Sequence, residues 1–146
     1  MGLNKVWIQT LSDGLLRADQ IVGLTAHATP SLPGKTSRWL LDATVAVPAG
    51  SGGGNGWDIG ILHRTLIQTP AEPAGAPEAL ARLLAELDQP DSAGVITPLA
   101  TDPPLTDAAA STVRFAFTSF TGDSPEANST HSAAQPSEAS QPQEVP

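Results

Sequence analysis

Apolar and polar residues alternate most regularly between Trp39 and Val47. A period of two is the period of a strand with one face against a core and the other face toward solvent. The segment is therefore predicted to form a half-buried strand. Its apolar positions are Trp39, Leu41, Ala43, Val45 and Val47.

A first hairpin is predicted near the start of the chain. Residues 6–11 are rich in strand-forming side chains, and Asp13-Gly14 supplies residues that tolerate a tight two-residue turn. A second strand is expected over residues 15–24, with a possible extension to residue 28. Pairing Leu11 with Leu16 is the register we consider first, although it is uncertain by one residue.

The remaining strand signals lie further along the chain. Residues 57–68 are apolar on both sides, which indicates a central strand, and residues 113–117 alternate as a half-buried final strand. Between these, residues 95–96 predict a short strand, and prolines favour an irregular crossing over residues 97–110. The glycine-rich run from Gly50 to Gly56 is interpreted as a flexible connection, too long for a tight hairpin.

One helix is predicted over residues 77–88. Pro77 suits a first-turn position, and Glu78 lies favourably near the positive end of the helix dipole. A helix of this length is marginal alone, so it must dock on the sheet. Its apolar stripe consists of Leu80, Leu83, Leu84 and Leu87.

The composition changes abruptly near Phe120. Residues 121–146 contain no Lys, Arg, Leu, Ile, Phe or Trp, so they cannot bury enough apolar surface to offset the entropy of ordering. We therefore expect a folded domain over residues 1–120 and a disordered acidic tail over residues 121–146. The domain is predicted to be a single strand-rich α+β unit, an antiparallel sheet or open barrel of four to six strands with one docked helix.

The charge and composition of the chain limit the kinds of partner that we expect. The net charge of -8 is shared equally, because residues 1–120 hold 11 acidic and 7 basic side chains and residues 121–146 hold 4 acidic and none basic. A phosphate backbone is repelled by both parts, so we expect no nucleic-acid partner. No run of about 18 apolar residues and no secretory signal pattern occurs, so we expect no membrane partner and a cytoplasmic protein.

His63 is the candidate catalytic residue. It shares its predicted strand face with apolar residues, and a desolvated imidazole with Asp58 or Asp42 beside it is suited to acid/base chemistry. The alternative interpretation is a core histidine that packs and makes hydrogen bonds. No nucleophile elbow, calcium loop or metal-ligand spacing is present, so neither a metal nor a cofactor is expected.

The candidate binding residues lie in and beside the glycine-rich run. Gly53, Asn55 and Trp57 are assigned to binding, and the alternative to a plain flexible connection is that the run acts as a lid. The run lacks the Lys-Ser/Thr ending and the following helix of a phosphate loop. Of Trp7, Trp39 and Trp57, at least two are expected to anchor the core.

These observations favour a non-catalytic protein-binding or assembly module, because exposed strand edges can pair with a partner's extended segment. The partner is expected to be protein. The first alternative is a small enzyme or small-molecule binder that uses the glycine-rich lid and His63. The second alternative is a structural component of a larger particle.

Overall fold

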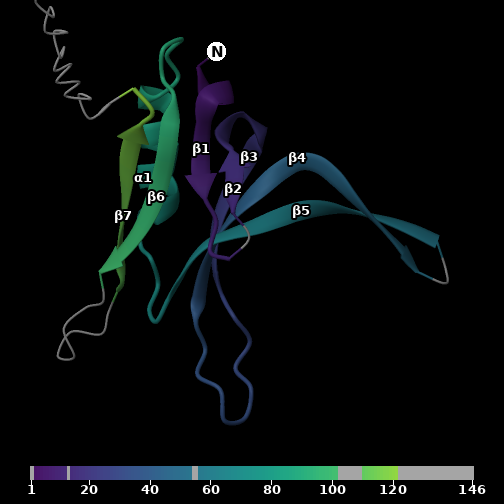
Figure 1. Cartoon of the computed structure of the whole chain (residues 1–146). Helices are drawn as coiled ribbons and strands as arrows, with labels where there is room; N and C mark the ends of the chain where they lie inside the picture. The colour runs from purple at the N-terminus through teal and green to yellow at the C-terminus, as the bar shows by residue number, and fades with distance from the viewer. Residues whose placement is uncertain (1, 13, 54–55, 102–109, 122–146) are drawn as a thin grey trace, which may run out of the picture.

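Two β-sheets and one α-helix make up the described part of the chain (Figure 1). The structure, a computed structural model, describes residues 2–12, 14–53, 56–101 and 110–121, and the side chains of these residues except 47–61. The prediction of a strand-rich α+β domain is confirmed. The strands divide between a four-stranded sheet and a three-stranded sheet in these ranges, where a single sheet or open barrel was expected.

The first sheet has the strand order β2-β1-β6-β7. It consists of β1 (Val6–Gln9), β2 (Leu15–Arg17), β6 (Gly94–Thr101) and β7 (Thr112–Ser119), and η1 (Leu3–Lys5) precedes β1. The β1 and β6 strands run parallel, whereas β2 and β7 are antiparallel to their neighbours. Strands that lie far apart in the sequence therefore pair in the middle of one sheet.

The second sheet is antiparallel, with the order β3-β4-β5. It contains β3 (Ile21–Ala28), β4 (Trp39–Gly53) and β5 (Gly56–Thr69). Leu41, Ala43 and Val45 of the predicted apolar set in β4 are buried, but Asp42 of the polar set is buried as well, so the predicted half-buried alternation holds only in part. The β3 strand pairs with β4 only as far as the Ile21–Val45 pair, while β5 continues beside β4 to the Gly53–Gly56 pair.

The predicted register of the first hairpin is wrong. Leu16 pairs with Ile8, and Leu15 pairs with Gln9, so Leu11 lies outside the ladder. The chain turns through a wider loop, in which the Thr10 backbone N–H and hydroxyl both donate to the Gly14 carbonyl oxygen at 2.9 Å. These hydrogen bonds take the place of the two-residue turn.

The strand expected over residues 15–24 is two strands in different sheets. A single 3₁₀ turn, η2 (Ala18–Gln20), separates β2 from β3. Ala18 is buried, and Arg17 Nε donates to Asp19 Oδ1 at 2.6 Å, which lowers the pKa of the Asp19 carboxyl. This compact turn lets the chain leave one sheet and enter the other.

The helix α1 (Ala76–Glu86) confirms the predicted helix. Gly75 precedes it with φ of 73°, a left-handed conformation that glycine adopts without the steric cost of a Cβ. Leu80 is fully buried, and the other three leucines of the stripe are half-buried against the core. The helix packs on β7 and β3, so it contacts both sheets.

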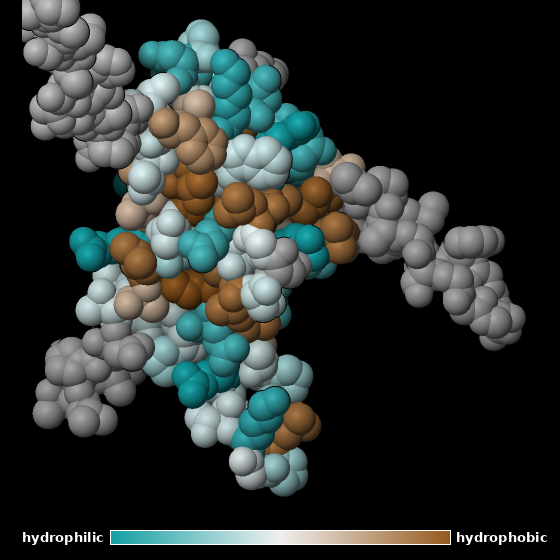
Figure 2. Space-filling view, in the orientation of Figure 1, coloured by the Kyte–Doolittle hydropathy of each residue, from teal (hydrophilic) through white to brown (hydrophobic). Residues whose placement is uncertain are grey.

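The core between the sheets and the helix is aliphatic, and its fully buried members include Val6, Ile8, Leu41, Leu80 and Ile96. Trp7 and Trp39 are half-buried and stand outside this cluster, so the expectation that two tryptophans anchor the core is wrong. Figure 2 shows that apolar residues also reach the surface across the middle of the molecule.

Two segments expected to be irregular are strands. The glycine-rich run continues β4 to Gly53, because an antiparallel ladder needs only the backbone groups that glycine retains. The β6 strand passes through Pro98 to Thr101. Proline is tolerated there because β1 pairs with β6 no further than Ile96, which leaves that edge of β6 without a described strand at Pro98.

The predicted β7 strand is confirmed, with Val113 buried and Phe115 and Phe117 half-buried. The predicted tail over residues 121–146 lies outside the described residues, apart from Thr121.

Candidate functional site

His63 lies on β5 directly opposite Thr44 of β4. Its Nδ1 is 3.2 Å from Thr44 Oγ1, and the residue is exposed. The His63 side chain is therefore not desolvated, as the predicted acid/base role requires. It is also not packed in the core, as the alternative interpretation requires. Asp42 is not its partner, and the side chain of Asp58 lies outside the described residues. The catalytic role of His63 stays a prediction.

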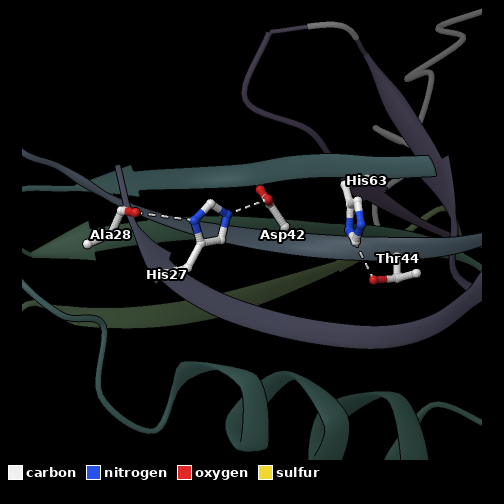
Figure 3. Close-up of polar contacts among 5 residues, drawn as sticks. All are labelled: His27, Ala28, Asp42, Thr44 and His63. Carbon is white, nitrogen blue, oxygen red and sulfur yellow. Dashed lines mark hydrogen bonds and ion pairs between the residues drawn. The ribbon is translucent and has the colours of Figure 1, made fainter. Parts of the chain in front are cut away.

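His27 has the carboxylate partner that was expected for His63 (Figure 3). Its Nε2 is 2.9 Å from Oδ2 of Asp42, and the pair joins the neighbouring strands β3 and β4. Asp42 is 8% exposed, and its second oxygen, Oδ1, is buried without a hydrogen-bond partner among the described residues. A buried carboxylate in this state is stabilised by a nearby positive charge.

The geometry favours the protonated form of His27. Its second nitrogen, Nδ1, faces the Ala28 carbonyl oxygen at 3.4 Å, so both ring nitrogens face acceptors. Only the imidazolium can donate from both nitrogens. The hydrogen bond to Asp42 accordingly raises the pKa of His27. The pair is therefore a structural link between two strands, because neither nitrogen is left free to take a proton from a substrate.

The sequence offered one signal for this pair that our predictions did not use. Asp42 lies among the polar positions of the alternating β4 pattern, and β3 ends close to His27. To place His27 beside Asp42, one must know the register between β3 and β4, in which Ala28 pairs with Trp39 across the loop of residues 29–38. Turn residues did not determine that register in advance, because Pro33-Gly34 permits several loop lengths.

The predicted binding residues do not gather around His63. Gly53 ends β4 and pairs with Gly56, while Trp57 pairs with Gly52. Trp57 and His63 are six residues apart on one strand, which at a rise of about 3.3 Å per residue separates their Cα atoms by roughly 20 Å. Asn55 and the side chain of Trp57 lie outside the described residues. A lid over His63 is therefore not formed by this part of β4 and β5.

The far parts of β4 and β5 form a two-stranded ribbon, residues 48–53 and 56–61, which we call the arm. Its pairing runs from Pro48 opposite Ile61 to Gly53 opposite Gly56, beyond the point where β3 stops. Figure 1 shows the arm projecting away from the other strands. Neither outer edge of the arm pairs with another described strand.

A shallow groove lies between the start of β3 and the first turns of α1. Its volume is about 450 Å³. Val22, one of its lining residues, is 66% exposed, and Glu78 supplies the sole charge of the lining. We call it the β3–α1 groove; it is lined by Ile21, Val22, Gly23, Leu24, Pro77, Glu78, Ala81 and Leu84.

Two smaller hollows of about 300 Å³ lie elsewhere, one on residues 29–38 with Gln68 and the other between η1, η2 and Asp88. Neither these two hollows nor the β3–α1 groove is lined by His27 or His63. Within the described ranges, no three His, Asp or Glu residues come together in a group able to hold a metal ion. No described helix has both the length and the apolar character needed to cross a membrane.

Comparisons with known proteins give no relative: no family model, no curated protein and no solved structure matches this chain.

Proposed function

We propose that this protein is a non-catalytic protein-binding or assembly module and that the arm is its binding element. The arm is the observation that carries the proposal. A two-stranded hairpin on its own is marginally stable at best in water, and three or more strands, or packing against a helix, are needed for independent stability. The arm extends beyond β3, so a partner is the means by which it gains a third strand or a covering surface.

The backbone chemistry of the arm supports this role. Ladder edges without a neighbouring strand present N–H and C=O groups that an extended segment can pair with. Glycine occupies Gly50, Gly52 and Gly53 in one strand and Gly56 and Gly60 in the other, so a partner backbone can approach closely. If the partner that pairs with the arm belongs to an ordered assembly, the protein is a structural component of a larger particle.

Removal of the arm tests the proposal. Replacing residues 46–61 with Asn-Gly joins Val45 to Leu62, which already pair, through a two-residue hairpin turn. We expect the trimmed chain to keep its circular dichroism spectrum, because the core residues Leu41, Ala43, Val45, Leu66 and Ile67 remain. The full chain and the trimmed chain are then used to capture partners from source lysate, and captured proteins are confirmed by titration with purified material.

A partner that binds the full chain and binds the folded, trimmed chain at least tenfold more weakly would support the proposal. Equal binding by the two chains would overturn the assignment of the arm. Absence of any binding partner, the chain itself included, would overturn the proposed function.

A further inference from the structure

We propose that the β3–α1 groove receives the arm of a second copy of this chain. The inference depends on the proposed function, since it names the partner that covers the arm. It places a donor element and an acceptor surface on the same molecule.

The groove has the two properties that strand addition requires. The outer edge of β3 has no described strand beside it, because β3 pairs only with β4 on its other side. The β3–β4 register shifts between Ile21 and Gly23, so Val22 is a bulge residue, and its side chain is two-thirds exposed. An added strand can pair with such an edge while its alternate side chains enter an apolar hollow.

Size and charge favour the arm as the occupant. A hollow of about 450 Å³ accepts a few side chains of a slender element and not the face of a globular domain. Glu78 on its rim and a net charge of -8 repel acidic segments. Residues 43–57 carry no charge at all, and Asp58 is the sole charged residue of the arm.

The apolar residues of the arm have the spacing of an added strand. Trp57, Ile59 and Ile61 stand two residues apart, which is the spacing of side chains that meet one surface. Asp58 belongs to the other alternate set of the sequence and does not share a face with these three residues.

The arm that enters the groove belongs to a second copy, because the arm of the same chain begins beside the groove and extends in another direction. The β4 strand passes Ile21 at its pair with Val45 and then continues beyond the end of β3. The arm therefore leaves the sheet next to the first residue of β3, and Figure 1 shows it projecting away from β3 and α1. In this conformation the arm does not reach the groove of its own chain, so the groove open to it is that of a second copy.

The absence of cysteine from the sequence makes cross-linking a direct test. A Val22→Cys chain is mixed with a size-tagged Ile59→Cys chain under mild oxidation. The control pairs Ile59→Cys with Leu99→Cys, since Leu99 is a 42% exposed residue on β6 in the other sheet. We expect a disulfide-linked heterodimer in severalfold excess over the control, and equal yields for the two mixtures would overturn the proposal.

Self-association of the unmodified chain is measured in parallel by size-exclusion chromatography with light scattering. We expect an assembly larger than a monomer that weakens at least tenfold in Val22→Asp and persists in Leu99→Asp. Melting curves confirm that both variants fold. A monomeric parent, or an assembly unaffected by Val22→Asp, would overturn the inference. A different purified protein that binds through Val22 would also overturn it while leaving the proposed function in place.

Discussion

Gly94 is held where three strands come together. It pairs with Val6 of β1 on one side and with Ser119 of β7 on the other. A Cβ at this position would lie against the Thr118 carbonyl oxygen and 2.7 Å from the Phe117 ring. The backbone of β7 cannot move away without loss of its pairing to β6, so the position accepts no side chain.

We therefore expect Gly94→Ala to lower the free energy of unfolding by about 1–3 kcal/mol, the usual range for overpacking. Urea denaturation followed by circular dichroism measures the change. Gly23→Ala is the matched control, because its Cβ would meet Thr44 at an ordinary contact distance of 3.4 Å. Equal losses in the two variants would contradict the close approach at Gly94.

The His27–Asp42 pair predicts a pH dependence. Because the pKa of His27 is raised in the folded state, its stabilising contribution is complete below the unfolded value of about 6.5. That contribution disappears as the pH rises through the higher folded pKa. We expect the difference in melting temperature between the parent and His27→Gln to shrink from pH 6 toward pH 9.

The expected change in melting temperature with pH is modest, because 48% of the His27 side chain is exposed to solvent and water screens the ion pair. His63→Gln is the control, since its partner is the Thr44 hydroxyl and not a carboxylate. A difference between the parent and His27→Gln that stays constant with pH would show that the pair does not link β3 to β4 through charge.

At the residue scale, the sequence indicated which residue types could react but not how they pair. His63 was chosen for its apolar neighbours in the sequence, yet it is exposed. The Asp42 carboxylate that was considered for it contacts His27. Alternation assigns a residue to a face of a strand, whereas a contact across strands depends on the register, which is determined by loops and bulges.

At the scale of elements, helix α1 connects the two sheets through Leu80. This side chain is fully buried within the cluster that includes Leu41 and Ile96, and the helix packs on β3 and β7. A helix of 11 residues has little stability of its own in water. Docking through this leucine is therefore what holds the helix in place.

Leu80→Ala is expected to destabilise the fold by about 2–5 kcal/mol, the range for large-to-small changes in a core. The measurement is chemical denaturation of the purified chain. Leu84→Ala serves as the comparison and should cost less, because Leu84 is half-buried and faces the β3–α1 groove. If the two variants were equally stable, Leu80 would not be the main contact of the helix.

The accuracy of the element predictions followed from the strength of each local signal. The helix and the strands β4 and β7 were predicted correctly because several residues repeat at one period. The break at Ala18 carried no such signal, since this small residue is buried by tertiary packing alone. The strand character of Gly50 to Gly53 was missed because pairing with β5 outweighs the low strand propensity of glycine.

At the scale of the whole molecule, β7 is the last strand in the part of the chain that the structure describes. It pairs with β6 from Thr112 to Ser119 and places Val113 in the core. The Phe120 backbone N–H donates to the Ala93 carbonyl oxygen at 2.9 Å, which holds the strand to the segment before β6. The folded unit therefore reaches close to the composition change identified in the sequence.

Truncation tests this boundary. Removal of residues 123–146 is expected to change the melting temperature little, because that segment lacks large apolar residues. Removal of residues 113–146 should abolish cooperative unfolding, since β6 loses its partner along its whole length. A large loss of stability from the shorter deletion would show that residues 123–146 contribute to the fold.

The parallel pairing of β1 with β6 also has a consequence for synthesis on the ribosome. β1 can pair with β2 soon after both strands are synthesised, but Val6 and Ile8 can pair with Gly94 and Ile96 only after residues 94–96 have been translated. Contacts between such distant parts of a chain slow folding. The four-stranded sheet is therefore completed only after β6 and β7 have been translated.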